Sequence, residues 1–259
     1  MITGTGTYAL PGLDAGEPER VKTRWGEARV TPGRLEAIDV LHISRHGEGH
    51  KKLSNHVPHR ANIAALKKLE ADCVLAVTVC GAVDPSVPLG SLIAFDDLHF
   101  LANRLADGSL CTFHQRPGER GRGHWIYGSP FSAQLRAALV AAAREAGSPA
   151  RDGGCYGHVD GPRFNTRAEI RGLAAAGVTA VSQTAGPETV LCGEAELPFA
   201  LLGYATDYAN GVSEMPTPVD ELLRLIEAST DVFATVVTRA LPKIPDELEP
   251  TGIVYRFEE

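Results

Sequence analysis

Short polar clusters rich in glycine and hydroxyl side chains recur along the chain, each where an apolar run ends. The most distinctive is SRHGEGHKKL (Ser44–Leu53), which follows the strand-like run DVLHI and contains Arg45, His46 and His50. The arginine offers a positive charge and a fork of donors, and glycine-rich turns expose backbone N–H groups to an oxyanion. These residue types indicate an anion site, although glycine and threonine at a strand end also serve as plain turn residues.

The other clusters have a similar composition. They are GTGT (Gly4–Thr7), TVCG (Thr78–Gly81), SQTAGPE (Ser182–Glu188) and ATDYANG (Ala205–Gly211). Ligands of open α/β sheets bind beyond the carboxyl ends of the strands, so we expect these clusters to converge on one site. GTGT is not a Walker loop, because no Gly-Lys-Ser/Thr follows it, and it is not a GxGxxG dinucleotide fingerprint either.

A metal site is the alternative for the histidines. His42, His46 and His50 recur every four residues, and imidazole is a zinc ligand. His42, however, lies in the strand-like run while the residues after it have a loop composition, so the three side chains need not share a face. No HExxH motif is present and no carboxylates are grouped with them. We therefore expect no metal.

The bulk composition narrows the class of protein. The chain has 259 residues, 44% of them hydrophobic, which is enough for a single domain over residues 1–259 with a well-buried core. Its net charge of −7 disfavours a broad basic face for nucleic acid. No run approaches the roughly 18 apolar residues of a membrane helix, and the N-terminus lacks signal-peptide features. With five scattered cysteines and no CxxC, we expect a reduced, cytoplasmic protein.

Apolar strand-like runs alternate with helical ones, which predicts an α/β fold with a mostly parallel sheet. The continuous run Cys73–Val83 is typical of a strand buried on both faces. Ser132–Gly147 begins with a good N-cap and ends with glycine, and Asp220–Leu241 reads as a long amphipathic helix. Arg104–Pro130 has no clear period and is expected to be a binding loop or an interface element. Residues 242–259 are expected to form an irregular tail.

Taken in order, these motifs resemble the trimeric purine nucleoside phosphorylases, specifically their 5′-methylthioadenosine and methylthioinosine phosphorylase branch. The resemblance extends to about Leu241 and is carried in part by GTGT and SRHGEGH, while its most specific motifs are DGPRF (Asp160–Phe164), GPE and ATDY. It implies a central mixed, mostly parallel twisted sheet or distorted barrel flanked by helices. It also implies a homotrimer or a dimer of trimers, with inorganic phosphate as co-substrate and no other cofactor.

The family reaction is cleavage of a purine nucleoside by phosphate, which gives the free base and a sugar 1-phosphate. Charge develops on the ribosyl carbon and the base in an oxocarbenium-like transition state, so donors that stay fixed must hold phosphate below C1′. The resemblance assigns His50 a supporting place. It assigns phosphate binding to Thr5, Arg45, His46, the Val79 backbone and Thr184.

Asp207 is implied as the catalytic residue, because a proton or hydrogen bond at purine N7 helps the base to leave. An ionised carboxylate would repel the N7 lone pair, so we expect burial to raise the pKa of Asp207. Phe164 is expected to pack on the purine, with core filler as the alternative. The residues implied for the base and ribose are Cys80, Gly81, Phe164, Ser182, Gln183, Thr206, Asp207 and Ala209. The 5′ pocket is assigned to Val219, Leu223 and the neighbouring subunit's His124.

Three positions depart from the family pattern. Ala209 stands where methylthioadenosine enzymes usually carry a second acid, so 6-oxopurine substrates stay open beside 6-aminopurines. Gln183 stands where methionine is usual beneath the ribose, and Asp160 replaces a commoner glutamate. The leading interpretation is phosphorolysis of methylthioadenosine or methylthioinosine to free purine and 5-methylthioribose 1-phosphate. The alternatives are a phosphorylase for inosine or guanosine with Ser213 or Glu214 at the 5′ hydroxyl, a hydrolase, and a non-catalytic nucleoside binder.

Overall fold

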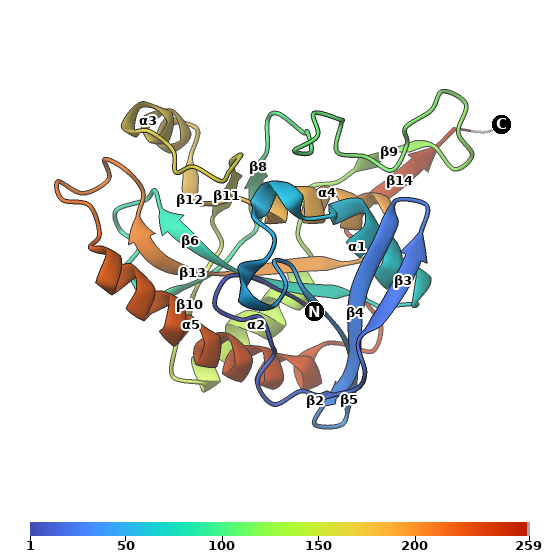
Figure 1. The fold of residues 1–259 in the computed structure, drawn as a ribbon, viewed down its shortest axis with the longest axis horizontal. Helices are drawn as coiled ribbons and strands as arrows, with labels where there is room; N and C mark the ends of the chain where they lie inside the picture. The colour runs from blue at the N-terminus through green and yellow to red at the C-terminus, as the bar shows by residue number, and fades with distance from the viewer. Residues whose placement is uncertain (258–259) are drawn as a thin grey trace.

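The computed structural model describes residues 1–257, which are built on one large twisted sheet (Figure 1). The main path of the sheet is β10-β7-β13-β6-β1-β5-β4-β2. Its strands are β1 (Ile2–Thr3), β2 (Asp14–Ala15), β3 (Glu19–Thr23), β4 (Gly26–Leu35), β5 (Ile38–Ser44), β6 (Val74–Ala82), β7 (Leu92–Ala94), β8 (Asp97–His99), β10 (Ala150–Asp152), β11 (Cys155–His158), β12 (Val178–Ser182) and β13 (Phe199–Tyr208). The centre, β5-β1-β6-β13, is parallel, while β4 pairs antiparallel with β5, β7 with β13 and β12 with β6. The predicted α/β class with a mixed sheet is confirmed.

Strands β6 and β13 form the apolar middle of the molecule. They pair over nearly their whole length, from Phe199 opposite Val74 to Tyr208 opposite Ala82. All but one residue of β6 and all but the last two of β13 are buried. A strand covered on both faces reads as a continuous apolar run, and this is how the run Cys73–Val83 was interpreted.

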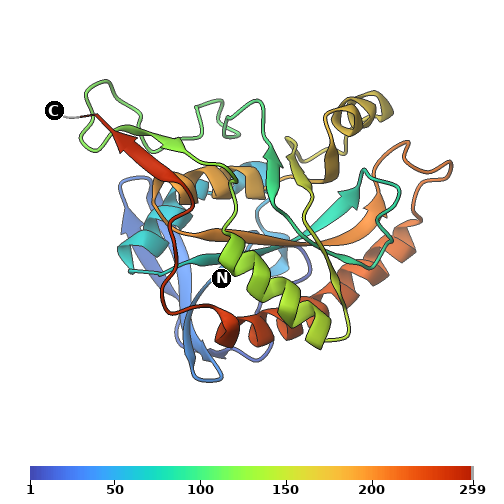
Figure 2. The same ribbon diagram turned by 180° about the vertical axis from the view of Figure 1, so that it is seen from behind.

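Five α-helices cover the two faces of the sheet within the described residues. They are α1 (His59–Lys68), α2 (Ala133–Glu145), α3 (Arg167–Ala175), α4 (Ala185–Glu194) and α5 (Val219–Ala240). Helices α2 and α5 pack together on one face, and α1 and α4 on the other (Figures 1 and 2). The predicted N-cap is confirmed, since the Ser132 hydroxyl accepts a hydrogen bond from the Leu135 amide at 3.4 Å.

The expectation of an irregular tail is wrong for one segment. Residues Ile253–Arg256 form β14, which pairs antiparallel with β9 (Gly123–Ile126) inside the otherwise irregular loop Arg104–Pro130. The two strands form an arm beside the main body (Figures 1 and 2). Each strand is four residues long, and they lie far apart in the sequence. Neither therefore carries a local hairpin signal, and each becomes a strand only against the other.

Two further observations concern the described residues as a whole. None of the described helices combines the length and the apolar character that a bilayer span requires. All five cysteines are free thiols, and Cys80, Cys111 and Cys192 are buried.

Candidate active site

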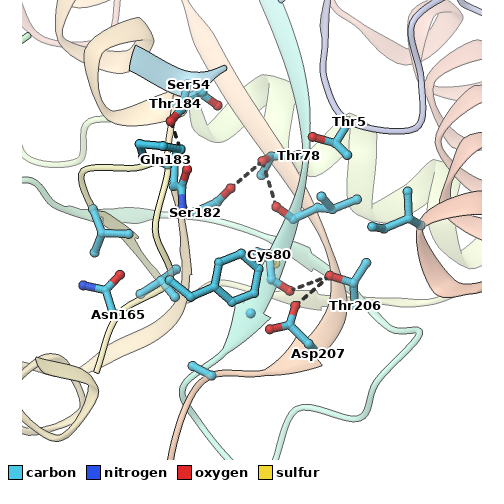
Figure 3. Close-up of a pocket in the computed structure, with 18 of the residues that line it drawn as sticks. Thr5, Ser54, Thr78, Cys80, Asn165, Ser182, Gln183, Thr184, Thr206 and Asp207 are labelled. Atoms are coloured by element: carbon cyan, nitrogen blue, oxygen red, sulfur yellow. Dashed lines mark hydrogen bonds between the residues drawn. The ribbon is translucent and has the colours of Figure 1, made fainter. Parts of the chain in front are cut away.

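The polar clusters meet in one cavity of about 290 Å³ at the carboxyl ends of the central parallel strands (Figure 3). Thr5 follows β1, Arg45 follows β5, and Asp207 lies near the end of β13. The convergence expected from the sequence is confirmed. The predicted residues that line this cavity are Thr5, Arg45, His46, Val79, Cys80, Gly81, Phe164, Ser182, Gln183, Thr184, Thr206, Asp207 and Ala209.

The residues predicted for the 5′ pocket are placed differently. Val219 and Leu223 are 70% and 59% exposed and do not line the cavity, whereas Leu222 and Ile226 do. All four positions lie on one stripe of α5, but only Leu222 and Ile226 of this stripe reach the cavity. His124 lies on β9, with its ring 5.3 Å from that of Phe257, and its role in a neighbouring subunit stays a prediction.

The sequence reasoning missed several residues at the cavity. Thr78, Ser54 and Asn165 line it, and Glu188 lies directly behind it. Thr78 and Glu188 belong to motifs that were recognised, TVCG and GPE, so the missing information was which residue of each motif faces inward. Ser54 belongs to a short 3₁₀ helix, Ser54–His56, whose sequence carries no chemical signal.

A buried ion pair forms the back of the end of the cavity that the sequence assigns to phosphate, here called the phosphate end, around Thr5, Arg45, His46 and Thr184. The Arg45 Nε and Nη2 atoms donate to the two carboxylate oxygens of Glu188 at 2.6 and 2.7 Å, and the two side chains are 1% and 0% exposed. Nη1 donates to the Val77 carbonyl at 3.2 Å. A Cβ at Gly4 would approach Nη1 to 2.5 Å, so glycine is required there. The guanidinium is held in one orientation, and its charge is matched by Glu188.

His46 is held as a neutral imidazole. Its Nδ1 lies 2.8 Å from the Lys52 carbonyl, which can only accept, so Nδ1 carries the hydrogen and Nε2 carries a lone pair. Burial, reinforced by the nearby Arg45 charge, lowers the pKa of His46 to about 4. Its ring stacks on His50 with centroids 4.3 Å apart, and His50 Nδ1 lies 3.1 Å from the Tyr8 hydroxyl.

Hydroxyl groups and backbone amides complete this end of the cavity. The Thr78 and Ser182 hydroxyls are 3.2 Å apart, which joins β6 to β12 (Figure 3). The amides of Thr184 and Ala185 at the start of α4 donate to the buried Tyr156 hydroxyl at 3.4 and 3.2 Å. The hydroxyl-bearing residues that line the cavity together with Arg45 include Thr5, Thr78, Ser182 and Thr184, and such donors suit an oxyanion.

Asp207 lies at the opposite end, beside Thr206 (Figure 3). The register of β13 against β6 shifts between Ala205 and Asp207, and such a bulge redirects a side chain. The Thr206 hydroxyl donates to Asp207 Oδ1 at 2.9 Å, and a Cβ at Gly81 would approach Oδ2 to 3.1 Å. Burial raises the pKa of Asp207, opposed in part by the Thr206 hydrogen bond. The direction matches the expectation for a carboxyl that must hold a proton.

Gln183 and Phe164 form the side of the cavity between these ends. The Ser54 hydroxyl donates to Gln183 Oε1 at 2.9 Å, and Gln183 Nε2 donates to the Arg163 carbonyl at 3.2 Å. A Cβ at Gly161 would come within 1.9 Å of Gln183 Oε1, so this glycine makes room for the amide. Phe164 lines the cavity and is 63% exposed, so the alternative of core filler is wrong.

The chain matches a known protein family over most of its length. The family model described as the phosphorylase superfamily matches residues 2–242. The chain belongs to the phosphorylase superfamily. This confirms the resemblance that the sequence motifs indicated, and with it a nucleoside phosphorylase.

Two curated relatives and one solved structure show the range of the superfamily around this phosphorylase. This chain is 32% identical to the 6-oxopurine nucleoside phosphorylase of Pyrococcus furiosus, over 95% of its own length and 93% of the relative. It is 31% identical to the S-methyl-5′-thioadenosine phosphorylase of the same organism, with the same coverage. A methylthioadenosine phosphorylase from Schistosoma mansoni in complex with adenine superposes with a TM-score of 0.85 at 25% identity, over 95% of this chain and 91% of that one.

These relatives do not settle the substrate of this phosphorylase, because the two P. furiosus relatives named for different purines are about equally similar to it. The site itself carries the remaining information. Ala209 is buried beside Gly81, and its methyl group offers neither an acceptor nor a donor to a base.

Proposed function

We propose that the chain catalyses phosphorolysis of a purine 5′-deoxy-5′-methylthio nucleoside, releasing the free base and 5-methylthioribose 1-phosphate. The observation that carries the proposal is the pairing of two ends in one cavity. One end holds an oriented arginine with several hydroxyls, and the other holds the partly buried carboxyl of Asp207. A nucleoside between them has its C1′ atom toward phosphate and its base toward Asp207.

The residues then act as follows. A phosphate oxygen forms a bond to C1′ while the bond from C1′ to the base nitrogen breaks, and its electron pair moves into the purine. Asp207, whose pKa is raised by burial, passes a proton to N7 as negative charge builds there. Arg45, Thr5, Thr78 and Thr184 keep phosphate in place without moving, which lowers the cost of reorganisation. Phe164 covers the purine face.

The 5′ substituent is inferred from the wall next to α5. Leu222 and Ile226 line this wall, and they suit a methylthio group better than a hydroxyl or a phosphate. Among the described residues that line the cavity, Arg45 is the only lysine or arginine, and Glu188 already engages it. Ser213 and Glu214, the candidates for a 5′ hydroxyl, are not lining residues. These features favour methylthio nucleosides over inosine and guanosine.

For the base we propose that both 6-amino and 6-oxo purines are accepted. Ala209 removes a second acceptor for a 6-amino group, and Asp207 alone discriminates less than two acids would. We also propose that the chain works as a trimer in which the arm β9–β14 brings His124 to the 5′ pocket of a neighbouring subunit.

The test is release of free base from methylthioadenosine, methylthioinosine, adenosine and inosine, each with and without phosphate. We expect phosphate-dependent release from both methylthio nucleosides at a higher kcat/KM than from adenosine and inosine. Release without phosphate would identify a hydrolase. A preference for inosine over methylthioinosine would replace this proposal with a general purine nucleoside phosphorylase, and tight binding without release would indicate a nucleoside binder.

A further inference from the structure

The phosphate end of the cavity holds no uncompensated positive charge. The titratable residues lining the cavity in the described chain are Arg45, His46, His50, Cys80 and Asp207, and burial raises the pKa of the Cys80 thiol, so it adds no charge. Arg45 is neutralised by the bidentate contact with Glu188, so the pair carries no net charge. A phosphate dianion placed here would bring two negative charges into a poorly solvated site with none to match them, which is costly.

The ring of His46 adds a second, geometric constraint. Its Nδ1 hydrogen is committed to the Lys52 carbonyl, so the neutral ring has a bare Nε2 lone pair left for a ligand. A fully deprotonated phosphate oxygen facing that atom would meet lone pair against lone pair. The contact becomes attractive only when a proton lies between the two atoms.

No neighbouring group supplies that proton beforehand. His46 stacks on His50, which is bound to the Tyr8 hydroxyl, and its chain neighbour Arg45 repels a charged imidazole. The carboxylate of Glu188 is occupied by Arg45. His59 of α1 also faces this pair, with its Nδ1 3.8 Å from Glu188 Oε1, but burial lowers its pKa, so it holds no proton to give. Burial together with the Arg45 charge lowers the pKa of His46 to about 4, so the free site enters the reaction with a neutral ring.

We propose that phosphate is bound together with one proton, held between a phosphate oxygen and Nε2 of His46, so that the substrate taken up is the monoanion. The inference rests on the proposed function and adds the protonation state of the co-substrate. Transfer of this proton to Nε2 leaves an imidazolium beside an HPO₄²⁻ nucleophile. Attack on C1′ gives the sugar phosphate monoanion, and Asp207 protonates the leaving purine. The imidazolium then returns its proton through solvent to the Asp207 carboxylate, which resets the site.

Calorimetric titration of inorganic phosphate into the purified protein tests this inference. The titration is done in two mildly alkaline buffers with different ionisation enthalpies, where free phosphate is a dianion. We expect an uptake of about one proton per phosphate bound, and a KM for phosphate that rises about tenfold per pH unit above the second pKa of phosphate. Binding of phosphate with no proton uptake, or a KM that stays flat over this range, would overturn the inference while leaving the proposed function intact.

Two matched variants locate the proton. His46→Gln offers an amide donor that does not titrate, so we expect its proton uptake to fall to near zero and its phosphate KM to lose the alkaline rise. His50→Gln changes the stacked neighbour in the same cavity and should retain the uptake. Uptake that survives in His46→Gln would contradict the assignment to His46. No binding of phosphate to the wild-type protein would overturn the proposed function and this inference together.

Discussion

The two ends of the cavity are built on different principles. At the phosphate end, Arg45 and Glu188 are almost fully buried and satisfy one another with short, bidentate contacts. At the base end, Asp207 has one hydroxyl partner, and Phe164 is 63% exposed. One end is a closed polar network and the other is an open, sparsely bonded surface.

The difference corresponds to two tasks: one end binds phosphate, which is common to all these reactions, and the other recognises the base, which differs between substrates. Phosphate is the same in every reaction of this kind, so its site can be rigid and internally saturated without loss of function. Such a network is stabilising only while every member is present. The base end has few obligatory partners, so single changes such as alanine at position 209 can alter substrate preference without disturbing the frame. The following predictions test this contrast.

Removing the carboxyl at the base end should give the largest effect on catalysis and little on stability. For Asp207→Ala we expect turnover to fall by ~10²–10⁴, the usual contribution of a general acid. The phosphate KM should change little, because Asp207 contacts none of the phosphate residues in the structure. Steady-state kinetics with methylthioadenosine measures both quantities. Near-normal turnover would exclude Asp207 as the acid.

Removing the arginine at the phosphate end should instead damage the fold. Arg45→Ala leaves the Glu188 carboxylate buried without its partner, which costs about 3–5 kcal/mol of unfolding free energy. Chemical denaturation measures this cost. The double variant Arg45→Met with Glu188→Leu removes both charges and should recover much of the loss without recovering activity. A stable Arg45→Ala protein would show that the ion pair is not part of the frame.

Acid should destabilise the protein through histidines buried in neutral form. His42 and His46 have pKa values lowered by burial to about 4, and burial also lowers that of His59. The unfolded chain takes up protons near pH 6.5, before the folded protein does, so stability is lost as the pH falls from about 6.5 toward 4. Each histidine contributes at most ~1.4 kcal/mol per pH unit. A melting temperature constant over this range would contradict the assignment.

The same contrast explains which parts of the site could be predicted from the sequence. The residues of the phosphate end lie in short motifs directly after strands, so their convergence followed from the α/β pattern alone. The partner of Arg45 could not be found in this way. Glu188 is 143 positions away, and nothing local shows that the glutamate of GPE turns inward. Long-range side-chain pairing depends on the packing of α4 against the sheet.

The sequence-based predictions differ from the structure at the exposed start of α5 and in the C-terminal segment. Val219 and Leu223 are expected in the 5′ pocket, but α5 presents Leu222 and Ile226 to the cavity. The four positions lie on one stripe of the helix, so the sequence pattern does not show which of them reach the cavity and which stay exposed. Strand β14 was missed because four residues without a nearby partner carry no strand signal.

Restoring an acid at the base end should change preference rather than rate. For Ala209→Asp we expect the ratio of kcat/KM for methylthioadenosine over methylthioinosine to rise, since a charged acceptor near a 6-amino group is worth about 1.5–3 kcal/mol. The position is buried beside Gly81, so Ala209→Asn serves as a control for size without charge. An unchanged ratio would mean that position 209 does not face the 6-substituent.

Gln183 offers the finest test, because it lies between the two ends. It is held by hydrogen bonds, like the phosphate end, and it lines the cavity near the expected sugar. Its amide spends one acceptor site on Ser54 and one N–H on the Arg163 carbonyl, which leaves one N–H and one lone pair for the vicinal hydroxyls of a ribose. Gln183→Met should therefore lower the ratio of kcat/KM for inosine over 2′-deoxyinosine. The lost hydrogen bond corresponds to about 0.5–1.5 kcal/mol.

Ser54→Ala separates recognition from support in this experiment. It removes the hydroxyl that orients the Gln183 amide but leaves the amide itself, so it should affect the ribo and deoxyribo substrates more evenly than Gln183→Met does. If each variant lowers kcat/KM for inosine and for 2′-deoxyinosine by the same factor, Gln183 only holds the Phe164 segment in place. It would then belong with the rigid phosphate end rather than with the part of the cavity that selects the substrate.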